Sequence, residues 1–560
     1  MSGLALSADA AATPIAPAGA PSAGHDRLAR VPPAWTIAAA LAAVYLILAP
    51  PSGDLAAAGY RSDLFARVGF TLWDNSWYGG HHLLAYSVLA PALGALIGQQ
   101  PLAALSVTLA SALFAALIKG RFPARATRIA GAWFALGAAI DLLSNRIPFD
   151  LGLPIALGAL LAAQRRRLGL ALVLAVLASL ASPVAGAFLA LVFLAWALAG
   201  PHDRRRPALL TLAALAPVVL LNLAFPEGGT QPFVASAFFP ALAGVLVIGA
   251  LIPPEQRLLR IGALLYALAL TGSYVLSTSV GGNADRLGAL MGAPVTALLL
   301  LGGSTIGRRP RLLLAAAPLL LYWQANAPAA DFASAQRDDP ATQASYYAPL
   351  LGELRALGVG YGSPPTRPAR IEVVPLADHW EARWLAPHIM IARGWERQLD
   401  TLRNAVFYAE EPLTAQRYEA WLWAQAISYV ALPDAPLDYS ASAEARLLRG
   451  AARPDYLREV WRSAHWRLFA VRGARPLAQP PGLLTQLNSD SFTLYAPRAG
   501  AYTVRLHFTP YWALATGSGC VSEAPGDWTR LQARRAGSLR VVIDFSLDRV
   551  FDHGPRCNLG

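Results

Sequence analysis

Long apolar runs alternate with short polar segments between about residues 34 and 324, and the pattern changes only after that point. Runs of about 20 apolar residues are typical of helices that cross a bilayer. The whole chain is 55% hydrophobic and 14% charged, whereas soluble domains contain roughly 25% charged residues. The pattern therefore predicts a polytopic membrane protein that resides in a lipid bilayer.

One apolar stretch is ambiguous, because residues 83–98 could cross the membrane or lie on its surface. As a span it would be one of twelve, and the basic loops at 119–128, 165–167 and 204–206 would lie outside. That arrangement opposes the rule that Lys and Arg stay on the cytoplasmic side. Without it, the inside loops hold 17 Lys and Arg and the outside loops 4.

We therefore predict that residues 83–98 form a short interfacial or re-entrant helix, broken at Pro91 and Gly94, within a long outer loop at 52–100. About eleven spans remain, near residues 34–51, 101–118, 128–144, 148–164, 168–182, 184–200, 207–225, 232–252, 259–278, 287–305 and 312–324.

The two ends of the chain differ from this central region. Residues 1–33 are rich in Ala, Pro and Ser without an apolar run, which predicts a disordered cytoplasmic tail and no cleaved signal peptide. The charge count places the region after residue 324 outside. There, 325–480 mixes helical and strand patterns, and 481–560 alternates apolar and polar residues.

The expected fold is thus a membrane all-α bundle of about 11 transmembrane helices, covering 34–324. An extracytoplasmic α+β portion and a β-sandwich-like domain follow it. The two cysteines, Cys520 and Cys557, both fall in this last domain. An even pair outside the cytoplasm predicts one disulfide, and two packed free thiols are the alternative.

The net charge of +12 does not require nucleic acid as a partner, because the orientation rule already explains where the arginines lie. The high content of Ala, Gly, Pro and Arg favours a bacterial source with a GC-rich genome. No nucleotide-binding fingerprint or nucleophile elbow is present, which argues against ATP-driven transport.

Acidic residues just outside a membrane span are candidates for chemistry. Asp54 follows the first span directly and opens a predicted amphipathic surface helix, DLAAAGYRSDLFARV, whose apolar face includes Leu64 and Val68. Asp74 follows within the aromatic stretch LWDNSWYGGHH. Either carboxylate could act as a general base, and the plain alternative for Asp54 is that it caps the helix.

The same aromatic stretch supplies candidate substrate-binding side chains. Trp77 and Tyr78 suit stacking on a sugar, although both residue types also populate membrane interfaces. His81 and His82 could bind phosphate, but adjacent histidines lack the spacing of metal ligands, so no metal site is predicted from them.

Two arginines lie in short outer loops, against the orientation rule. Arg146 follows the third span, and Arg286 follows Asn283 at the start of the tenth. A guanidinium matches phosphate geometry, so the two arginines are candidates for holding a lipid phosphate, and Asn283 is a further candidate for substrate binding. The alternative is structural pairing, of Arg146 with Asp141 or Asp150 and of Arg286 with Asp285. The outer segment LADHWEARWLAPHIMIARGWERQLD could form an acceptor-binding surface or an ordinary packed helix and strand.

The chain resembles the GT-C superfamily of polytopic glycosyltransferases in the order of its elements: one span, an acid, an amphipathic helix, an aromatic turn and a second interfacial helix. The resemblance covers the whole chain as architecture and residues 54–82 as a motif. It implies a sugar transferred from a polyprenyl-phosphate donor to a cell-envelope glycan or lipid acceptor, with Asp54, or else Asp74, as the catalytic base. It also implies the bacterial cytoplasmic (inner) membrane, with the N-terminus inside. No tight Asp-x-Asp motif is present, which leaves a requirement for a divalent metal open.

Two other classes remain. A secondary transporter or lipid-linked-sugar flippase would carry polar residues near the middle of its spans, whereas here polarity gathers at their outer ends. A non-catalytic envelope assembly protein could keep the same fold and leave the loop acid idle.

Overall fold

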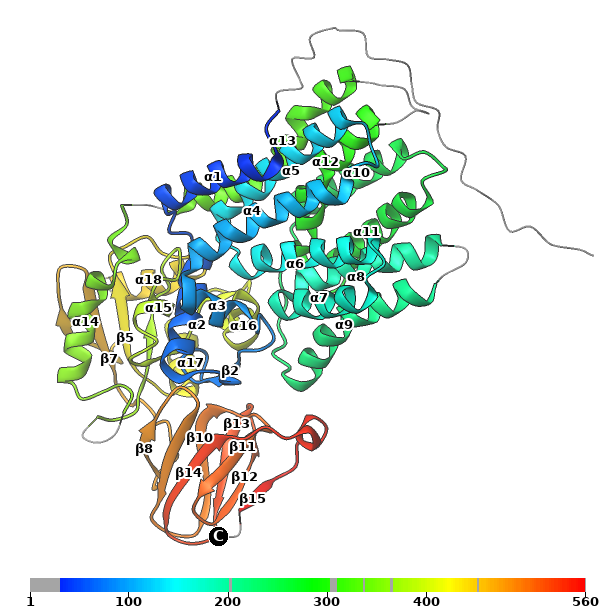
Figure 1. The fold of residues 1–560 in the computed structure, drawn as a ribbon. Helices are drawn as coiled ribbons and strands as arrows, with labels where there is room; N and C mark the ends of the chain where they lie inside the picture. Colours follow the sequence, from blue (N-terminus) through cyan, green and yellow to red (C-terminus); the bar gives the residue numbers. More distant parts are fainter. Residues whose placement is uncertain are drawn as a thin grey trace, which may run out of the picture.

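The computed structural model describes residues 31–200, 204–302, 310–335, 338–362, 366–450 and 453–558. Almost all of the tail predicted over residues 1–33 lies outside these ranges. Figure 1 shows a helical half that contains α1 to α13, and beside it a C-terminal half built from sheets and short helices.

The helices of the first half follow one another with short connections. They are α1 Ala34–Leu48, α2 Gly53–Val68, α3 Ala90–Ile97, α4 Gln99–Ile118, α5 Ala124–Asp141, α6 Ile147–Gln164, α7 Leu168–Ala181, α8 Pro183–Ala199, α9 Arg205–Ala224, α10 Ala235–Leu251, α11 Arg257–Val275, α12 Arg286–Gly302 and α13 Pro310–Ser334. A helix stands at each predicted span, and α13 continues past the predicted end at residue 324.

Six of the described helices are long and apolar enough to cross a membrane: α4, α5, α6, α9, α11 and α12. A seventh span results if α1 and α2, bent by 84° to each other, are taken together. The apolar helices α7, α8 and α10 are shorter. These lengths indicate a multi-pass membrane protein, and the number of eleven spans stays a prediction.

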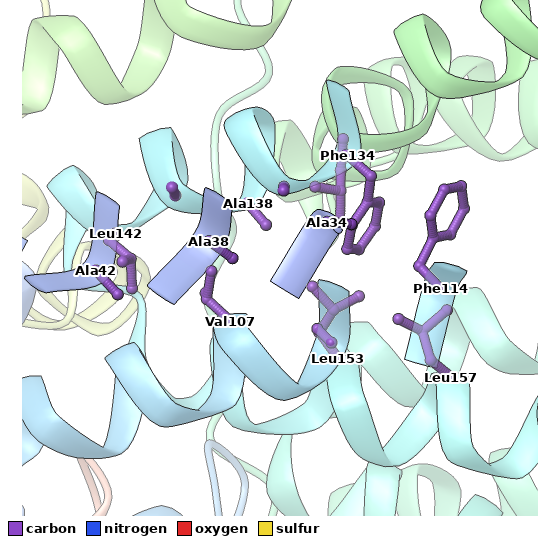
Figure 2. Packing of buried hydrophobic residues seen from close by; sticks show 14 of the residues in the cluster. Ala34, Ala38, Ala42, Val107, Phe114, Phe134, Ala138, Leu142, Leu153 and Leu157 are labelled. Carbon is purple, nitrogen blue, oxygen red and sulfur yellow. The ribbon is translucent and has the colours of Figure 1, made fainter. Parts of the chain in front are cut away.

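Small side chains allow the first helix to lie close against its neighbours. Ala34, Ala38 and Ala42 recur at every fourth position on one face of α1, and all three are buried. Figure 2 shows this face against Val107 of α4 and Ala138 of α5. Helices in a bilayer gain their stability from such close van der Waals packing, so α1 is held firmly at the position where the outer loop begins.

The outer loop contains two helices, and neither matches the prediction in every detail. α3 has eight residues, about 12 Å of helix at 1.5 Å per residue, whereas a bilayer core is about 30 Å thick. α3 is therefore too short to cross a bilayer by itself, and the interfacial position of residues 83–98 stays a prediction. The predicted break at Pro91 and Gly94 is wrong, because Pro91 lies in the first turn of α3 and Gly94 inside it.

The helix predicted to lie on the membrane surface, α2, is instead largely enclosed by protein. Leu55, Tyr60 and Leu64 belong to the hydrophobic core of the C-terminal half, and Arg383 Nε donates to Asp63 Oδ2 at 3.3 Å. Val68, at the end of the expected apolar face, is exposed. α2 therefore joins the bundle to the outer domains.

The C-terminal half comprises two domains, which we call the outer domains after their predicted location; the first is a five-stranded sheet with helices around it. Its strands lie in the order β4-β3-β5-β7-β6, with β4, β3 and β5 parallel and β7 and β6 antiparallel. The elements are α14 Ala344–Ala356, β3 Arg370–Val373, α15 Glu381–Trp384, β4 Met390–Ile391, α16 Arg397–Arg403, α17 Ala415–Ala424, β5 Ile427–Pro433, α18 Ser442–Arg449, β6 Leu457–Arg462 and β7 Trp466–Val471.

Two four-stranded antiparallel sheets form the last domain, as the alternating pattern predicts. Their orders are β10-β13-β12-β15 and β11-β14-β9-β8. The strands are β8 Leu483–Leu487, β9 Ser491–Ala496, β10 Gly500–His507, β11 Trp512–Thr516, β12 Gly519–Ala524, β13 Trp528–Ala533, β14 Gly537–Ile543 and β15 Arg556–Asn558. Cys520 and Cys557 are opposite each other on β12 and β15 and are joined by the predicted disulfide.

The disulfide closes a long loop and ties the last strand to the sandwich. The two cysteines are 37 residues apart, a separation for which loss of unfolded-state entropy stabilises a domain by about 2–4 kcal/mol. We expect the double variant Cys520→Ser, Cys557→Ser to lower the thermal unfolding midpoint of the outer domains and to speed proteolysis near β15. An unchanged midpoint and cleavage pattern would contradict this.

Candidate active site

The corner between α1 and α2 is fastened to the turn before α6 by one buried amide. Asn145 Nδ2 donates to Pro50 O at 3.0 Å and to Ser52 Oγ at 2.9 Å, and Asn145 Oδ1 accepts from the Tyr45 hydroxyl. Asn145 has a φ of 52°, a conformation that Asn adopts more readily than most residues. The corner and the turn are therefore fixed to each other.

These hydrogen bonds hold the start of α2, which carries the predicted base Asp54, against the turn that carries Arg146. Asp54 lies in the first turn of α2, and burial raises the pKa of Asp54 to about 6, although Arg146 and Arg286 lower it. The carboxyl therefore titrates near neutral pH in the field of two guanidinium groups, which suits a general base.

A cavity of about 180 Å³ opens beside the two arginines, between the end of α5, the starts of α6 and α12, and α13; Asp54 is not among its lining residues. Arg146, Asn283 and Arg286, three of the substrate-binding candidates from sequence, all line it. Asp141 and Asp285 line it as well.

The two arginines differ in how well their charge is balanced. Arg146 pairs with Asp141 at 3.2 Å and with Asp331 at 3.1 Å, so the structural pairing considered for it does occur. Arg286 Nη2 donates to Asn283 Oδ1 at 2.5 Å and its guanidinium lies 5.4 Å from the Phe149 ring centroid. Within the described ranges, no carboxylate forms a direct ion pair with Arg286, and Asp285 accepts from Trp323 Nε1. The cavity lining holds two arginines and two aspartates, so Arg286 differs from Arg146 in lacking a contacting carboxylate, while Asp141 and Asp54 act on it at longer range.

A second polar group faces this cavity and was not identified from sequence. Gln324 of α13 lines the cavity and is only 3% exposed, yet neither its amide nitrogen nor its amide oxygen has a hydrogen-bond partner. A buried amide without partners is costly and is typical of a place that a polar ligand or water completes. The only signal in the sequence is a Gln at the end of an apolar run.

The remaining candidates form a buried hairpin rather than part of the cavity. We call residues 71–82 the aromatic hairpin; its strands β1 Trp73–Asp74 and β2 His81–His82 pair antiparallel. Its backbone is hydrogen-bonded to both outer domains, with Ile391 N donating to Ser76 O at 2.9 Å and His507 N donating to Gly79 O at 2.8 Å. The hairpin therefore lies at the junction of the outer domains.

Asp74, Trp77 and Tyr78 make contacts that explain their burial. The Tyr60 hydroxyl donates to Asp74 Oδ2 at 2.7 Å and Ser76 N donates to Asp74 Oδ1 at 3.0 Å, so both carboxylate oxygens accept hydrogen bonds. Trp77 Nε1 donates to a backbone carbonyl of α15 at 3.2 Å, and the Tyr78 hydroxyl donates to Glu396 O at 2.9 Å. None of these three side chains lines the cavity.

The adjacent histidines point to different surroundings. His81 stacks on Trp77 with ring centroids 5.3 Å apart, and burial lowers its pKa well below the usual range. His82 Nδ1 lies 2.8 Å from Glu227 Oε1, and its Nε2 lies 3.0 Å from Thr509 Oγ1. Among the described residues, no group of three His, Cys, Asp or Glu side chains could hold a metal ion.

Farther along α2 from Asp54, Arg61 contacts residues of the outer domain. Arg61 of α2 is buried, pairs with Glu396, and lies 4.4 Å from the Tyr86 ring centroid. Tyr86 is within the electrostatic reach of both Asp54 and Arg286, and burial raises the pKa of Glu396 to about 7. The charged segment predicted as an acceptor surface therefore contacts α2 at Arg61, through Glu396 and through Trp395, whose ring centroid is 5.7 Å from the Arg61 guanidinium.

Other charged residues of that segment are structural. Arg393 and Asp400 form a buried pair at 2.6 Å, and His379 Nδ1 lies 3.1 Å from Glu381 Oε1.

The sequence matches no protein-family model, and it matches no curated protein. Among solved structures, the oligosaccharyltransferase of Archaeoglobus fulgidus in its apo form aligns with 94% of this chain and 95% of its own, with a TM-score of 0.50 and 12% identity. The protein is similar in fold to an oligosaccharyltransferase. The likeness is one of fold, a helical half followed by a C-terminal half that contains sheets.

A second structure, the archaeal oligosaccharyltransferase AglB from Archaeoglobus fulgidus in complex with an inhibitory peptide and a dolichol-phosphate, aligns with 71% of this chain and 69% of its own. Its TM-score is 0.44 and its identity 14%.

Substitution of Asn145 tests whether its hydrogen bonds hold the α1–α2 corner against the turn before α6. We expect Asn145→Ala to remove the donor from the Pro50 carbonyl and one of the two hydrogen bonds of the Ser52 hydroxyl, which still donates to Ser144 O. An unpaired buried group costs about 1–3 kcal/mol, so the thermal midpoint in detergent should fall. Asn222→Ala is the control, because Asn222 is exposed on α9 and bonds only to its own helix. Equal midpoints for both variants would contradict the assigned role.

Proposed function

We propose that the protein is an integral membrane glycosyltransferase of GT-C type. It moves a sugar from a polyprenyl-phosphate donor to a cell-envelope glycan or lipid acceptor on the outer membrane face. The observation that carries this proposal is that Arg146 and Arg286, which line the cavity, both act electrostatically on Asp54, although Asp54 itself is not among the lining residues.

In the proposed reaction, Asp54 takes the proton of the acceptor hydroxyl as that oxygen attacks the anomeric carbon. The bond between the anomeric carbon and the phosphate oxygen breaks, and the lipid phosphate leaves with the electron pair. A carboxylate with a pKa of about 6 is ionised at neutral pH and still basic enough to accept a proton in the transition state.

The leaving phosphate develops negative charge that the cavity is suited to stabilise. Arg286 offers a guanidinium without a carboxylate partner in the described chain, and Gln324 offers an amide without a hydrogen-bond partner. Preformed donors aimed at developing charge are a large contribution to catalysis. Arg146, already paired with two aspartates, positions Arg286 and Asp54 and contributes less net charge.

The opposite side of Asp54 is suited to the acceptor. Arg61 of α2 pairs with Glu396 of the outer domain, and its guanidinium lies near the rings of Tyr86 and Trp395. In this proposal the donor approaches from the bundle and the acceptor from the outer domain, so that the two substrates meet at Asp54.

A flippase or secondary transporter is the second class of function. It needs polar groups along a path through the bundle. The described polar cavity instead lies at one end of the helices, among residues that begin or end α5, α6 and α12. This position favours a reaction at the membrane face over passage through it.

Substitution of Asp54 tests the base directly. We expect Asp54→Asn to lower sugar transfer from polyprenyl-phosphate sugars to a crude envelope-glycan acceptor by at least about 100-fold, with release of lipid phosphate lost in parallel. The measurement uses purified protein in nanodiscs, with the thermal midpoint confirming that the variant is folded.

Two matched controls carry the same substitution elsewhere. Asp63→Asn lies on the same helix, in a half-exposed pair with Arg383, and should keep transfer within about two-fold, since exposed pairs contribute little. Asp74→Asn replaces the second candidate base. If a folded Asp74→Asn variant still transfers sugar, Asp74 is excluded as the catalytic base. Loss of transfer in Asp74→Asn but not in Asp54→Asn would reverse the assignment.

The pKa of Asp54 predicts the acid side of the pH profile. The carboxylate is the active form, so transfer should be constant above about pH 7 and fall through a midpoint near 6 as the group is protonated. Arg286 lowers this pKa; in Arg286→Gln the acid limb should therefore move to higher pH. A limb at the same pH in both proteins would contradict Asp54 as the titrating base.

A further inference from the structure

A groove of about 550 Å³ separates the end of α17 from the β-sandwich, and the proposed reaction makes no use of it. It is lined by the segment before β8 and by strands β10 and β13, with Arg475, Gln479, Thr503, Arg505 and Trp528 as its polar and aromatic side chains. Binding sites for small ligands have comparable volumes, about 300–1,000 Å³.

Two side chains, His507 and Arg370, pack against the Trp528 ring and fix its orientation. Its ring stacks on buried His507 with centroids 4.4 Å apart and 24° between the planes. The Arg370 guanidinium lies 5.6 Å from its centroid, and Arg370 itself is buried and donates to the backbone oxygens of Gln425 and Arg505. Trp528 remains partly exposed, so a rigid aromatic surface borders the groove.

The cations at the groove lack acidic partners. Arg505 Nη1 donates to Pro476 O at 3.3 Å, and the charge that acts on Arg505 is the like charge of Arg475. No carboxylate in the described part of the chain forms an ion pair with either guanidinium. Like charges gathered without counter-charges favour a bound anion.

The sheet register extends this surface. On β13, Thr529 and Leu531 are buried, so that Trp528 and Arg530 face outward, as alternation in a strand requires. Thr503 of β10 is opposite Arg530. The outer face of this sheet thus continues from the groove with a third arginine and a hydroxyl group.

We propose that this groove and the adjoining sheet face bind an acidic saccharide, one that carries carboxylate or phosphate groups on its rings. A flat indole fits the apolar face of a pyranose, flanking amide and hydroxyl groups fit its hydroxyls, and guanidinium pairs fit its acidic groups. Figure 1 shows the sandwich at the end of the molecule away from the helical half, which favours a glycan over a membrane headgroup. The site is separate from Asp54 and goes beyond the proposed transfer reaction.

Binding of defined saccharides to the full-length protein tests the site without any donor lipid. In nanodiscs of phosphatidylcholine, calorimetry should detect trigalacturonate or trehalose 6-phosphate, but not maltotriose. A response to only one acidic probe identifies the acidic group that the site takes. Arg475→Gln, Arg505→Gln should weaken that binding at least 10-fold, because it removes both guanidinium groups from the groove.

The control is Arg534→Gln, Arg540→Gln, which removes the same charge from exposed positions that do not line the groove; it should leave the affinity within two-fold. Trp528→Ala should also weaken binding at least 10-fold in a protein with an unchanged midpoint. The proposal is overturned if wild type binds neither acidic saccharide or binds maltotriose equally. Stronger binding of poly-glutamate than of either saccharide would overturn it in favour of an acidic peptide. An equal loss of affinity in the control variant Arg534→Gln, Arg540→Gln would also overturn the proposal, because the binding would then reflect non-specific charge attraction.

Discussion

The insertion of the first outer loop between the bundle and the outer domains is the constraint on which the rest of the structure depends. The aromatic hairpin bonds to both outer domains through Ile391 and His507, and it turns at Gly79, where an added Cβ would lie 2.4 Å from Arg370. α2 carries this hairpin at one end and Asp54 at the other. Because one rigid segment spans both halves, the position of the outer domains also fixes the position of the acid.

Electrostatics at the cavity follows from the same geometry. Asn145 holds the α1–α2 corner against the turn that carries Arg146, and burial there raises the pKa of Asp54 while the arginines moderate it. Arg146 forms ion pairs with Asp141 and Asp331, whereas Arg286 forms none among the described residues. The Arg286 guanidinium is therefore the one of the two that a substrate phosphate could contact without first displacing a carboxylate.

The outer half contributes two surfaces of different character. Trp395 and Glu396 contact Arg61 on α2, the helix that also carries Asp54. The groove at Trp528 and Arg505 lies at the junction with the sandwich, where it would hold a more distant part of a glycan. A polymer that occupied both surfaces would gain effective concentration at the catalytic acid.

The sequence by itself determined the class of protein, the helices at the predicted spans, and the sandwich with its disulfide. These follow from apolar periodicity and loop charge, which are local properties. It also indicated Arg146, Asn283 and Arg286, because polar residues at helix ends stand out against apolar runs. Only the tertiary structure decided that the aromatic hairpin is buried, that Gln324 faces the cavity and that Arg61 meets Glu396. Those relations join residues far apart in the chain, and a single sequence carries no signal for which distant side chains will pack together.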